Sequence, residues 1–522
     1  MEPDTAAQAA DRPAPLTENP SAPGHGATPP SDTGEAVLRI SAAAFPPGVP
    51  HPSTAEASPP SGLTRARALP RRSVLVAAAL GLGLTAGGTL ATRKLLPTAP
   101  DTLAERPLHS LTVAFTSADA RGPVSAPDQV IPGTRVQAHA ENAHLLVRRE
   151  EDWLDSLAPW TRTSPHADLI RNAYLDLFVL TEGLPATAAG WTSAWRHIWP
   201  RDTAHAAAAF AAAGDLPRAD ALLEHLAAAP RTEAGWFEAR YDIRGGGAPD
   251  DRSPQFDGLG WAAWALGWIH ENAVLDVTER ASFVRRHAAF ASSLATSMLA
   301  ALNPRSGGPP VSSDYWEVFE WRVTLGVAAP TLAGLQRLQP VLAAADDPLA
   351  RKCAVAEAAL TEYIRERFAE HGFPRHAHGR HADSAVGFML PPYLASWPDP
   401  ENARRALAET EARLLQPAGG ITPGERWADD GVSWTPETAV FALANATSAE
   451  AAHRARAARQ LEWLAAHRTP AGSFPEKVLA SGEPSAVAPL AWTAACAALA
   501  AHALTRAGDS RTGDGMRARS QR

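Results

Sequence analysis

The sequence predicts an all-α protein whose main body is an (α/α)6 barrel of twelve helices, preceded by a disordered tail and one membrane or signal segment. Alanine dominates the composition, and the alternating β-branched pattern of strands is scarce beyond residue 150. Twelve helical segments can be counted from apolar spacing and from Gly and Pro punctuation. Polar and aromatic loops precede every second one of these segments.

Length and composition fit one large domain better than several small ones. The chain has 522 residues, and a single helical barrel can use most of that length. A net charge of −8 offers no basic surface for phosphates, which excludes nucleic acid as a partner. Sixteen Trp residues are unusual, and flat indole faces suit sugar rings. Cys353 and Cys496 lie in Ala-rich helical stretches without metal-ligand spacing, and we interpret them as small buried residues.

The N-terminal part predicts export. Residues 1–70 are rich in Pro, Ala, Ser and Gly and form a predicted disordered tail. Residues 71–94 begin with Arg71-Arg72 and continue with an uncharged Ala/Gly/Leu stretch. This segment is interpreted either as a twin-arginine signal or as an uncleaved anchor crossing the membrane through residues 73–92. Both place the bulk of the chain outside the cytoplasm, secreted or anchored; a buried soluble helix is the third interpretation.

The remaining boundaries follow from helical periodicity. Residues 95–164 are a predicted linker and lead-in segment, 165–506 the barrel, and 507–522 a disordered C-terminal tail. Six helical hairpins can close into a double ring in which every second helix lines the centre. The twelve helices are predicted to start near residues 166, 202, 217, 259, 278, 321, 346, 383, 400, 434, 449 and 489.

Six loops precede the even-numbered helices of this count. In a closed ring of hairpins they meet at one mouth, together with the N-terminal N–H groups of the inner helices. The loops are Trp199–Asp202, Pro254–Asp257, Tyr315–Glu317, Arg380–Asp383, Trp427–Asp430 and Phe474–Lys477.

Four ordered motifs in these loops carry a family resemblance. They are Trp-Pro-Arg-Asp at 199–202, Pro-Gln-Phe-Asp-Gly at 254–258, Asp-Tyr-Trp-Glu at 314–317, and Phe-Pro-Glu-Lys-Val at 474–478, the last followed by Pro-Leu-Ala-Trp at 489–492. With them the chain resembles glycoside hydrolase family 15, which contains glucoamylases, glucodextranases and some trehalases. The resemblance covers roughly residues 165–505.

This resemblance implies an inverting, exo-acting hydrolase that releases glucose from an α-glucoside, either an oligosaccharide or an α-glucan. Glu317 is the implied general acid and Glu476 the implied general base. Arg201 and Asp202 would grip the non-reducing sugar. The other implied substrate-binding residues are Trp199, Gln255, Asp257, Trp316, Arg426, Trp427 and Trp492. No metal and no cofactor are expected.

Two departures from the family pattern concern substrate choice. Val318 stands where a second Glu usually follows the general acid. Residues 421–424, Ile-Thr-Pro-Gly, stand where an Arg-Tyr-Pro run usually binds the sugar, and Arg426 is the nearby candidate to substitute. The sequence therefore leaves the linkage and the preferred chain length open.

The chemistry explains why two distant carboxyl groups are needed. Inversion takes one carboxylic acid for the leaving oxygen and one carboxylate for water, about 6.5–9.5 Å apart. Glu317 is flanked by Tyr315, Trp316 and Phe319, which predicts an apolar setting, whereas Glu476 adjoins Lys477.

Taken singly, these residues also have a purely structural interpretation: Glu317 as a surface carboxylate, Glu476 as a helix-start carboxylate, and Arg201-Asp202 as a capping salt bridge. The convergence of four motifs on one mouth outweighs it. Glu320 is interpreted as structural. His197, His205 and His381 lack ligand spacing, so no metal site is predicted.

Two alternatives remain. One is a catalytically silent, membrane-tethered carbohydrate-binding protein, favoured by the two departures and disfavoured by the retained carboxylates. The other is a helical polysaccharide lyase, which needs a Tyr or His base and cations for uronates; five Tyr and an acidic balance argue against it.

Overall fold

The computed structural model describes residues 107–192 and 194–520, with side chains described through 508. The predicted tail 1–70 and the predicted signal segment 71–94 lie outside the described residues. Within the described part, no helix combines the length and the apolar character needed to cross a membrane.

The described chain is mostly helical, with a few very short strands. The α-helices are α2 (Ala143–Ser156), α3 (Trp160–Thr163), α4 (Ala167–Thr181), α5 (Pro200–Ala212), α6 (Leu216–Ala228), α7 (Asp257–Asn272), α8 (Val277–Ala301), α9 (Leu325–Ala344), α10 (Leu349–Arg367), α11 (Pro400–Leu414), α12 (Thr435–Ala446), α13 (Ala451–Ala466) and α14 (Ala491–Ser520). The 3-10 helices are η1 (Pro127–Gln129), η2 (Ala369–His371) and η3 (Ser384–Met389). The antiparallel strand sets are β1 (Thr112–Phe115) with β2 (Arg121–Val124), β3 (His197–Ile198) with β4 (Tyr241–Asp242), and β5 (Ser433–Trp434) with β6 (Lys477–Val478) and β7 (Pro484–Ser485).

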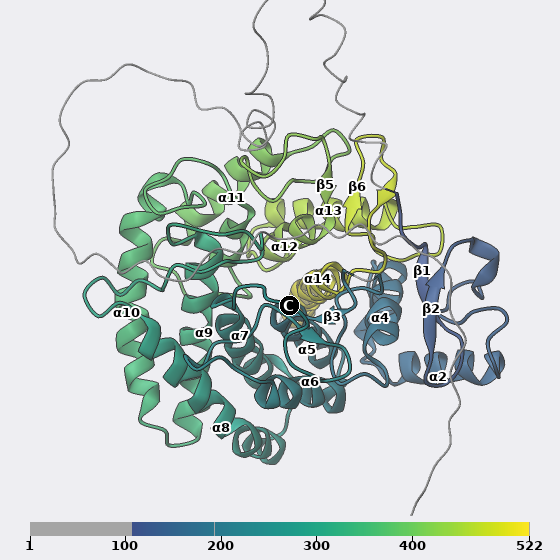
Figure 1. Cartoon of the computed structure of the whole chain (residues 1–522), viewed down its shortest axis with the longest axis horizontal. Helices are drawn as coiled ribbons and strands as arrows, with labels where there is room; N and C mark the ends of the chain where they lie inside the picture. Colours follow the sequence, from purple (N-terminus) through teal and green to yellow (C-terminus); the bar gives the residue numbers. More distant parts are fainter. Residues whose placement is uncertain (1–106, 193, 521–522) are drawn as a thin grey trace, which may run out of the picture. The chain divides into compact units, whose positions relative to one another are not determined.

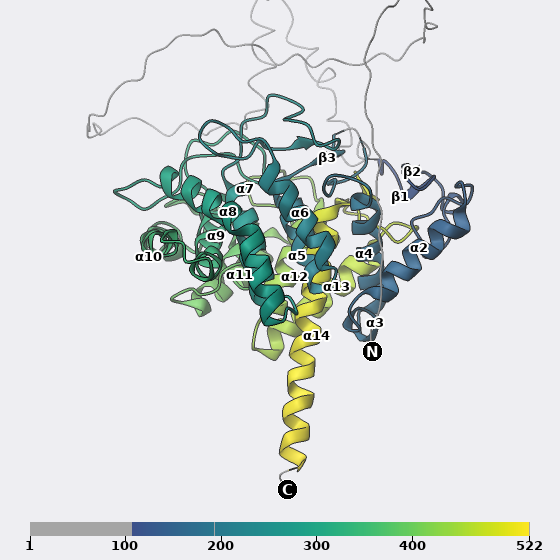
Figure 2. The same ribbon diagram turned by 90° about the horizontal axis from the view of Figure 1, so that it is seen from below.

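Six elements form a closed inner ring. α5 packs against α7, α7 against α9, α9 against η3, η3 against α12, α12 against α14, and α14 again against α5. Around them, α6, α8, α10, α11 and α13 pack against neighbouring inner elements, and α4 packs against α14 (Figure 1). Nearly every residue of α5, α7, α9 and α12 is buried, whereas α6, α10, α11 and α13 bury one face only. This arrangement fits an (α/α)6 barrel. Figure 2 shows it from the side, with β3 at one end and α14 extending past the other.

The predicted helix starts agree with the structure, with one correction of type. The largest offset is four residues, at α9, which begins at Leu325 instead of near 321. The eighth predicted helix is not an α-helix but the short 3-10 helix η3. Two features stop it: Pro391 and Pro392 follow it, and Gly387 lies so close to α12 that an added Cβ would be 2.7 Å from Val440.

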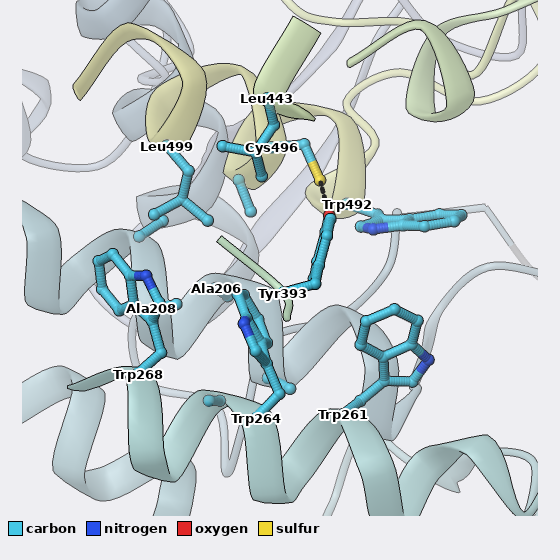
Figure 3. Close-up of a cluster of buried hydrophobic side chains, with 14 of the residues drawn as sticks. Ala206, Ala208, Trp261, Trp264, Trp268, Tyr393, Leu443, Trp492, Cys496 and Leu499 are labelled. Atoms are coloured by element: carbon cyan, nitrogen blue, oxygen red, sulfur yellow. Dashed lines mark hydrogen bonds between the residues drawn. The ribbon is translucent and has the colours of Figure 1, made fainter. Parts of the chain in front are cut away.

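The centre of the ring is filled with aromatic and small side chains. Figure 3 shows Trp261, Trp264 and Trp268 of α7 facing Tyr393 and residues of α14. Glycines let the inner helices approach closely, because a Cβ at Gly267 would lie 2.0 Å from a backbone oxygen of α9. The two cysteines are free and buried, as predicted.

The segment predicted as a lead-in is folded onto the barrel. β1 is fully buried, and α2 packs against α4. The Ser110 hydroxyl donates to the carbonyl oxygen of Ala488 at 2.7 Å, and the hydroxyls of Thr112 and Ser473 share a hydrogen bond of 2.6 Å. Residues 107–115 are therefore hydrogen-bonded to the loop before α14, and we call this contact the N-terminal clasp. At the other end, α14 continues to Ser520, past the predicted start of a disordered tail, since no proline interrupts it after residue 506.

Candidate active site

The loops ahead of the inner elements contact one another around the ring, at the end where the inner helices begin. Hydrogen bonds link neighbouring loops, from the Tyr315 hydroxyl to Asp383 Oδ1 (2.6 Å), from the Ser384 N–H to the Pro423 oxygen (2.9 Å), and from the Thr435 N–H to the Glu476 oxygen (3.0 Å). The predicted meeting of these loops at one end is therefore present in the structure.

One short segment ahead of α5 contacts both proposed catalytic glutamates. The Trp199 indole N–H donates to Glu317 Oε1 at 2.6 Å, and the Trp195 indole N–H donates to Glu476 Oε1 at 3.2 Å. Because the two Trp residues are four positions apart, their Cα atoms are separated by at most ~14 Å. Glu317 and Glu476 therefore lie against the same five-residue stretch, although they are far apart in the sequence.

Glu317 occupies a strained backbone position. Its φ is 53°, in the left-handed region that non-glycine residues rarely adopt, and its N–H donates to the Asp314 oxygen at 2.7 Å. Such strain is concentrated at functional sites. The carboxylate also forms an ion pair with Arg252, from the loop before α7, and its side chain is 22% exposed.

The predicted apolar setting of Glu317 is wrong. Phe319 is 70% exposed, and the carboxylate faces the Arg252 guanidinium. The reason is the later start of α9: residues 318–324 form a loop, so Phe319 does not pack against the barrel.

Glu476 is mostly buried, and it lies beside the positive charge of Lys477, as predicted. Its side chain is 10% exposed, and Lys477 Nζ lies 3.3 Å from Oε2. The same ammonium group lies 4.1 Å from the centre of the Trp434 ring. The Glu476 N–H donates to the Val487 oxygen at 2.8 Å, which fixes the backbone at the carboxylate.

A buried carboxylate of α4 anchors the loop that carries Glu476. Asp176 accepts hydrogen bonds from the Phe474 N–H at 2.9 Å and from the Ser473 hydroxyl at 2.6 Å. Arg135 Nε, also fully buried, lies 2.7 Å from Asp176. Burial raises the pKa of Asp176, while Arg135 acts in the opposite direction. Hydrogen bonds to Asp176, which is itself paired with Arg135, thus anchor the loop that carries Glu476 to α4.

Arg201 and Asp202 form a buried pair in the first turn of α5. Arg201 Nη2 lies 2.9 Å from Asp202 Oδ2, and the guanidinium carbon lies 4.5 Å from the centre of the Trp492 ring. Burial raises the pKa of Asp202; Arg201 lowers it, and the charge of Glu317 raises it again. The pair therefore lies within the electrostatic reach of Glu317.

Asp257 and Gln255 are buried at the start of α7. Asp257 Oδ2 accepts a hydrogen bond from the Trp261 indole at 3.2 Å. Burial raises the pKa of Asp257 to about 7, against the opposing effect of Arg201. Gln255 is 5% exposed, and its backbone N–H donates to the Phe237 oxygen at 3.3 Å.

Three further predicted residues come from the third and fifth loops. Trp316 is buried, and its ring centre lies 4.9 Å from that of Trp427. The guanidinium carbon of Arg375 lies 3.6 Å from the Trp316 ring centre. Arg426 is exposed, so it does not join the buried set.

Arg375 is the centre of a buried carboxylate network that supports these loops. Its guanidinium contacts Asp314 and Asp383 at 3.0 Å each and Glu320 at 2.6 Å. Glu320 also accepts a hydrogen bond from His376 at 2.8 Å, in line with its structural interpretation. The network joins the third loop to the fourth.

The histidines near the mouth have separate environments. His205 is fully buried between the Arg201 carbonyl oxygen and the Tyr393 hydroxyl, and burial lowers its pKa to about 3. His381 is 44% exposed beside Glu425. Among the described residues, no group of three or more His, Cys, Asp or Glu side chains could hold a metal ion.

Several polar atoms of this region are buried and have no hydrogen-bond partner within the described chain. Both donors and acceptors are present, which is the mixture that sugar hydroxyls can satisfy. The atoms are Nε and Nη1 of Arg201, the indole nitrogens of Trp316, Trp434 and Trp492, the hydroxyls of Thr422 and Ser433, and Oε2 of Glu437.

Sequence reasoning missed three residues of the site. Trp195 and Arg252 lie just before the first and second motifs. Of the two, only Trp195 has a signal in the sequence, because it is a second Trp close to Trp199. Glu437 lies in the first turn of α12, where a carboxylate has the ordinary explanation of stabilising a helix N-terminus.

Comparison with known proteins places the chain among solved glycosidases by fold. No family model matches the sequence, and no curated protein matches it. Among solved structures, the chain is similar to a wild-type glycosidase with a TM-score of 0.54 and 20% identity, over 65% of this chain and 96% of that one.

Two glucoamylases are similar as well. One is a bacterial glucoamylase complexed with acarbose, with a TM-score of 0.55 and 15% identity over 70% of this chain and 60% of that one. The other is the glucoamylase from Saccharomycopsis fibuligera, with a TM-score of 0.51 and 12% identity over 66% of this chain and 96% of that one. The protein thus has the fold of glycosidases and glucoamylases.

Proposed function

We propose that this protein is an inverting, exo-acting glycoside hydrolase that releases glucose from an α-glucoside. The observation that carries the proposal is the contact of Trp199 with Glu317 and of Trp195 with Glu476. A sugar bound against this segment would have one glutamate available on each side of its linkage. The fold shared with solved glycosidases supports the same activity.

Glu317 would act as the general acid and Glu476 as the general base. The Lys477 ammonium group stabilises the ionised carboxylate that a base needs in order to activate water. Glu317 must carry a proton, so its ion pair with the half-exposed Arg252 has to open when the leaving group enters. The protonated Glu317 carboxyl group would then donate its proton to the glycosidic oxygen.

Arg201 and Asp202 would hold the terminal glucose. A guanidinium only donates and a carboxylate only accepts hydrogen bonds, so the pair can bind two neighbouring hydroxyls. The Trp492 ring packs against Arg201, and Trp316 and Trp427 contribute aromatic rings from the third and fifth loops. Similar structures contain acarbose or glucose, which supports a glucoside as substrate.

A substrate panel tests the reaction and its stereochemistry. We expect glucose release from at least one of maltose, isomaltose, dextran and trehalose, with the β-anomer of glucose appearing first in the NMR spectrum. First appearance of the α-anomer would contradict inversion, because inversion at an α-linkage gives β-glucose. Binding of these sugars without hydrolysis of any of them would instead favour the silent carbohydrate-binding protein.

We also propose that residues 71–94 direct the domain out of the cytoplasm, either as a twin-arginine signal or as an anchor through residues 73–92. Replacing Arg71 and Arg72 by Lys should leave the protein in the cytoplasmic fraction of the producing cells, as measured by immunodetection after fractionation. An unchanged distribution would exclude the twin-arginine route.

A further inference from the structure

Glu437 is a buried carboxyl group that the proposed mechanism does not use. It lies in the first turn of α12 and is 3% exposed. Its Oε2 atom is buried and has no hydrogen-bond partner among the described residues. A carboxyl oxygen left in this state costs free energy, and the usual resolutions are protonation or a ligand.

The surroundings of Glu437 keep it neutral. Burial is the main reason why its pKa is raised to about 8; the charges of Glu476 and Asp383 contribute to the rise, whereas a hydrogen bond from its own backbone N–H and the charge of Arg201 oppose it. Below that pH, Glu437 is therefore a neutral acid with one O–H donor, while Glu476 keeps its partner Lys477.

The elements packed against α12 bring these groups together. η3 begins next to Asp383, and the loop before α14 carries Glu476, whose carbonyl oxygen accepts a hydrogen bond from the Thr435 N–H at 3.0 Å. Arg201 of α5 is near enough for its charge to act on Glu437. Unpartnered buried donors also come from the residues just before Glu437, namely the Ser433 hydroxyl and the Trp434 indole. These donors and Glu437 belong to one stretch of five residues.

We propose that Glu437 is a substrate-binding residue whose buried, unpartnered Oε2 forms a hydrogen bond with a hydroxyl of the glucose unit held by Arg201 and Asp202. This inference rests on the proposed function. A neutral acid adds a donor to the site without adding a third negative charge near Glu476 and Asp202. It also complements Asp202, whose Oδ2 is paired with the Arg201 guanidinium.

Paired substrate and protein deletions test this contact. Glu437→Ala should lower kcat/KM for the best substrate of the panel by roughly tenfold to a hundredfold. Among monodeoxy analogues of that substrate, the wild type should hydrolyse one more slowly than the parent sugar. On that analogue, the wild type and Glu437→Ala should have the same kcat/KM. Glu437→Gln, which keeps an N–H donor, should retain most of the activity.

Infrared spectroscopy reports the protonation state independently of activity. The difference spectrum between the wild type and Glu437→Gln should show the band of a neutral carboxylic acid at pH 7, which disappears as the pH rises through about 8. Glu150→Gln is the matched control, since Glu150 is a buried carboxyl group of α2 whose pKa burial raises to about 7. Its replacement should remove a similar band without changing the response to any deoxy analogue.

The outcomes separate this inference from the proposed function. A wild type that hydrolyses none of the substrates overturns the proposed function itself. An active wild type in which Glu437→Ala loses activity equally on the parent and on every deoxy analogue overturns the contact with a hydroxyl. An active and folded Glu437→Ala with unchanged kcat/KM overturns the role of Glu437 altogether.

Discussion

Replacing Glu476 or Glu317 by Gln should lower kcat for glucoside hydrolysis by about 10²- to 10⁴-fold, the usual contribution of a general acid or base. Each amide keeps the size of the side chain and an oxygen that can accept the indole N–H of Trp195 or Trp199. The loss should therefore appear in turnover, with the unfolding temperature little changed. Steady-state kinetics and thermal unfolding of both variants provide the measurement.

The two glutamates can be told apart by the leaving group. Fluoride departs from α-glucosyl fluoride without needing a proton, so Glu317→Gln should hydrolyse it at close to the wild-type rate. Glu476→Gln should remain inactive on the fluoride, because water still has to be activated. If the fluoride restores neither variant, or restores both, the assignment of acid and base is wrong.

Replacing Arg375 by Met should reduce the free energy of unfolding by about 3–5 kcal/mol, because it leaves buried carboxylates without their shared cation. Arg375 contacts Asp314, Asp383 and Glu320, and both aspartates are fully buried. Equilibrium unfolding in urea at pH 7 measures the loss. Arg365→Met is the control, since Arg365 makes ion pairs on the exposed face of α10 and its loss should change stability very little.

The pH dependence of Arg375→Met distinguishes lost charge balance from lost packing. Burial raises the pKa of Asp383 above its unfolded value, even with Arg375 nearby to lower it. A group with a raised folded pKa takes up a proton on folding, so lowering the pH through that pKa favours the folded state. Losing Arg375 raises the pKa of Asp383 further, so the variant gains more stability than the wild type as the pH falls below 7, and its stability deficit should shrink. A deficit that stays constant over this range would indicate a packing defect.

Much of the fold could be predicted because its physical signals are local. Apolar spacing and helix punctuation placed the helix starts within four residues, and the alternation of plain and polar loops separated the inner from the outer elements. The exception is η3, where an α-helix was predicted and a 3-10 helix is present. Apolar periodicity does not register the two features that prevent a longer helix, namely the following pair of prolines and the close approach to α12.

The candidate site was less predictable because its contacts join distant segments. Arg201, Asp202 and Glu476 could be found from motifs, but nothing near Glu317 in the sequence indicates that Arg252 pairs with it. Glu437 was missed because an acidic residue at a helix start has an ordinary explanation until its burial is known. Arg375, the cation shared by three carboxylates, lies between motifs and has no local signal.

The N-terminal clasp, between residues 107–115 and the loop before α14, affects the order in which the protein folds during synthesis. The hydrogen bonds of Thr112 with Ser473 and of Ser110 with Ala488 join positions 361 and 378 residues apart. Contacts of such long range form late, because closing the intervening loop costs entropy before any contact rewards it. A nascent chain on the ribosome could already present Arg201 while Glu476 is still unsynthesised or undocked. The chain would then become able to hydrolyse a substrate only after α14 and the loop before it have docked, and incomplete chains would be inactive.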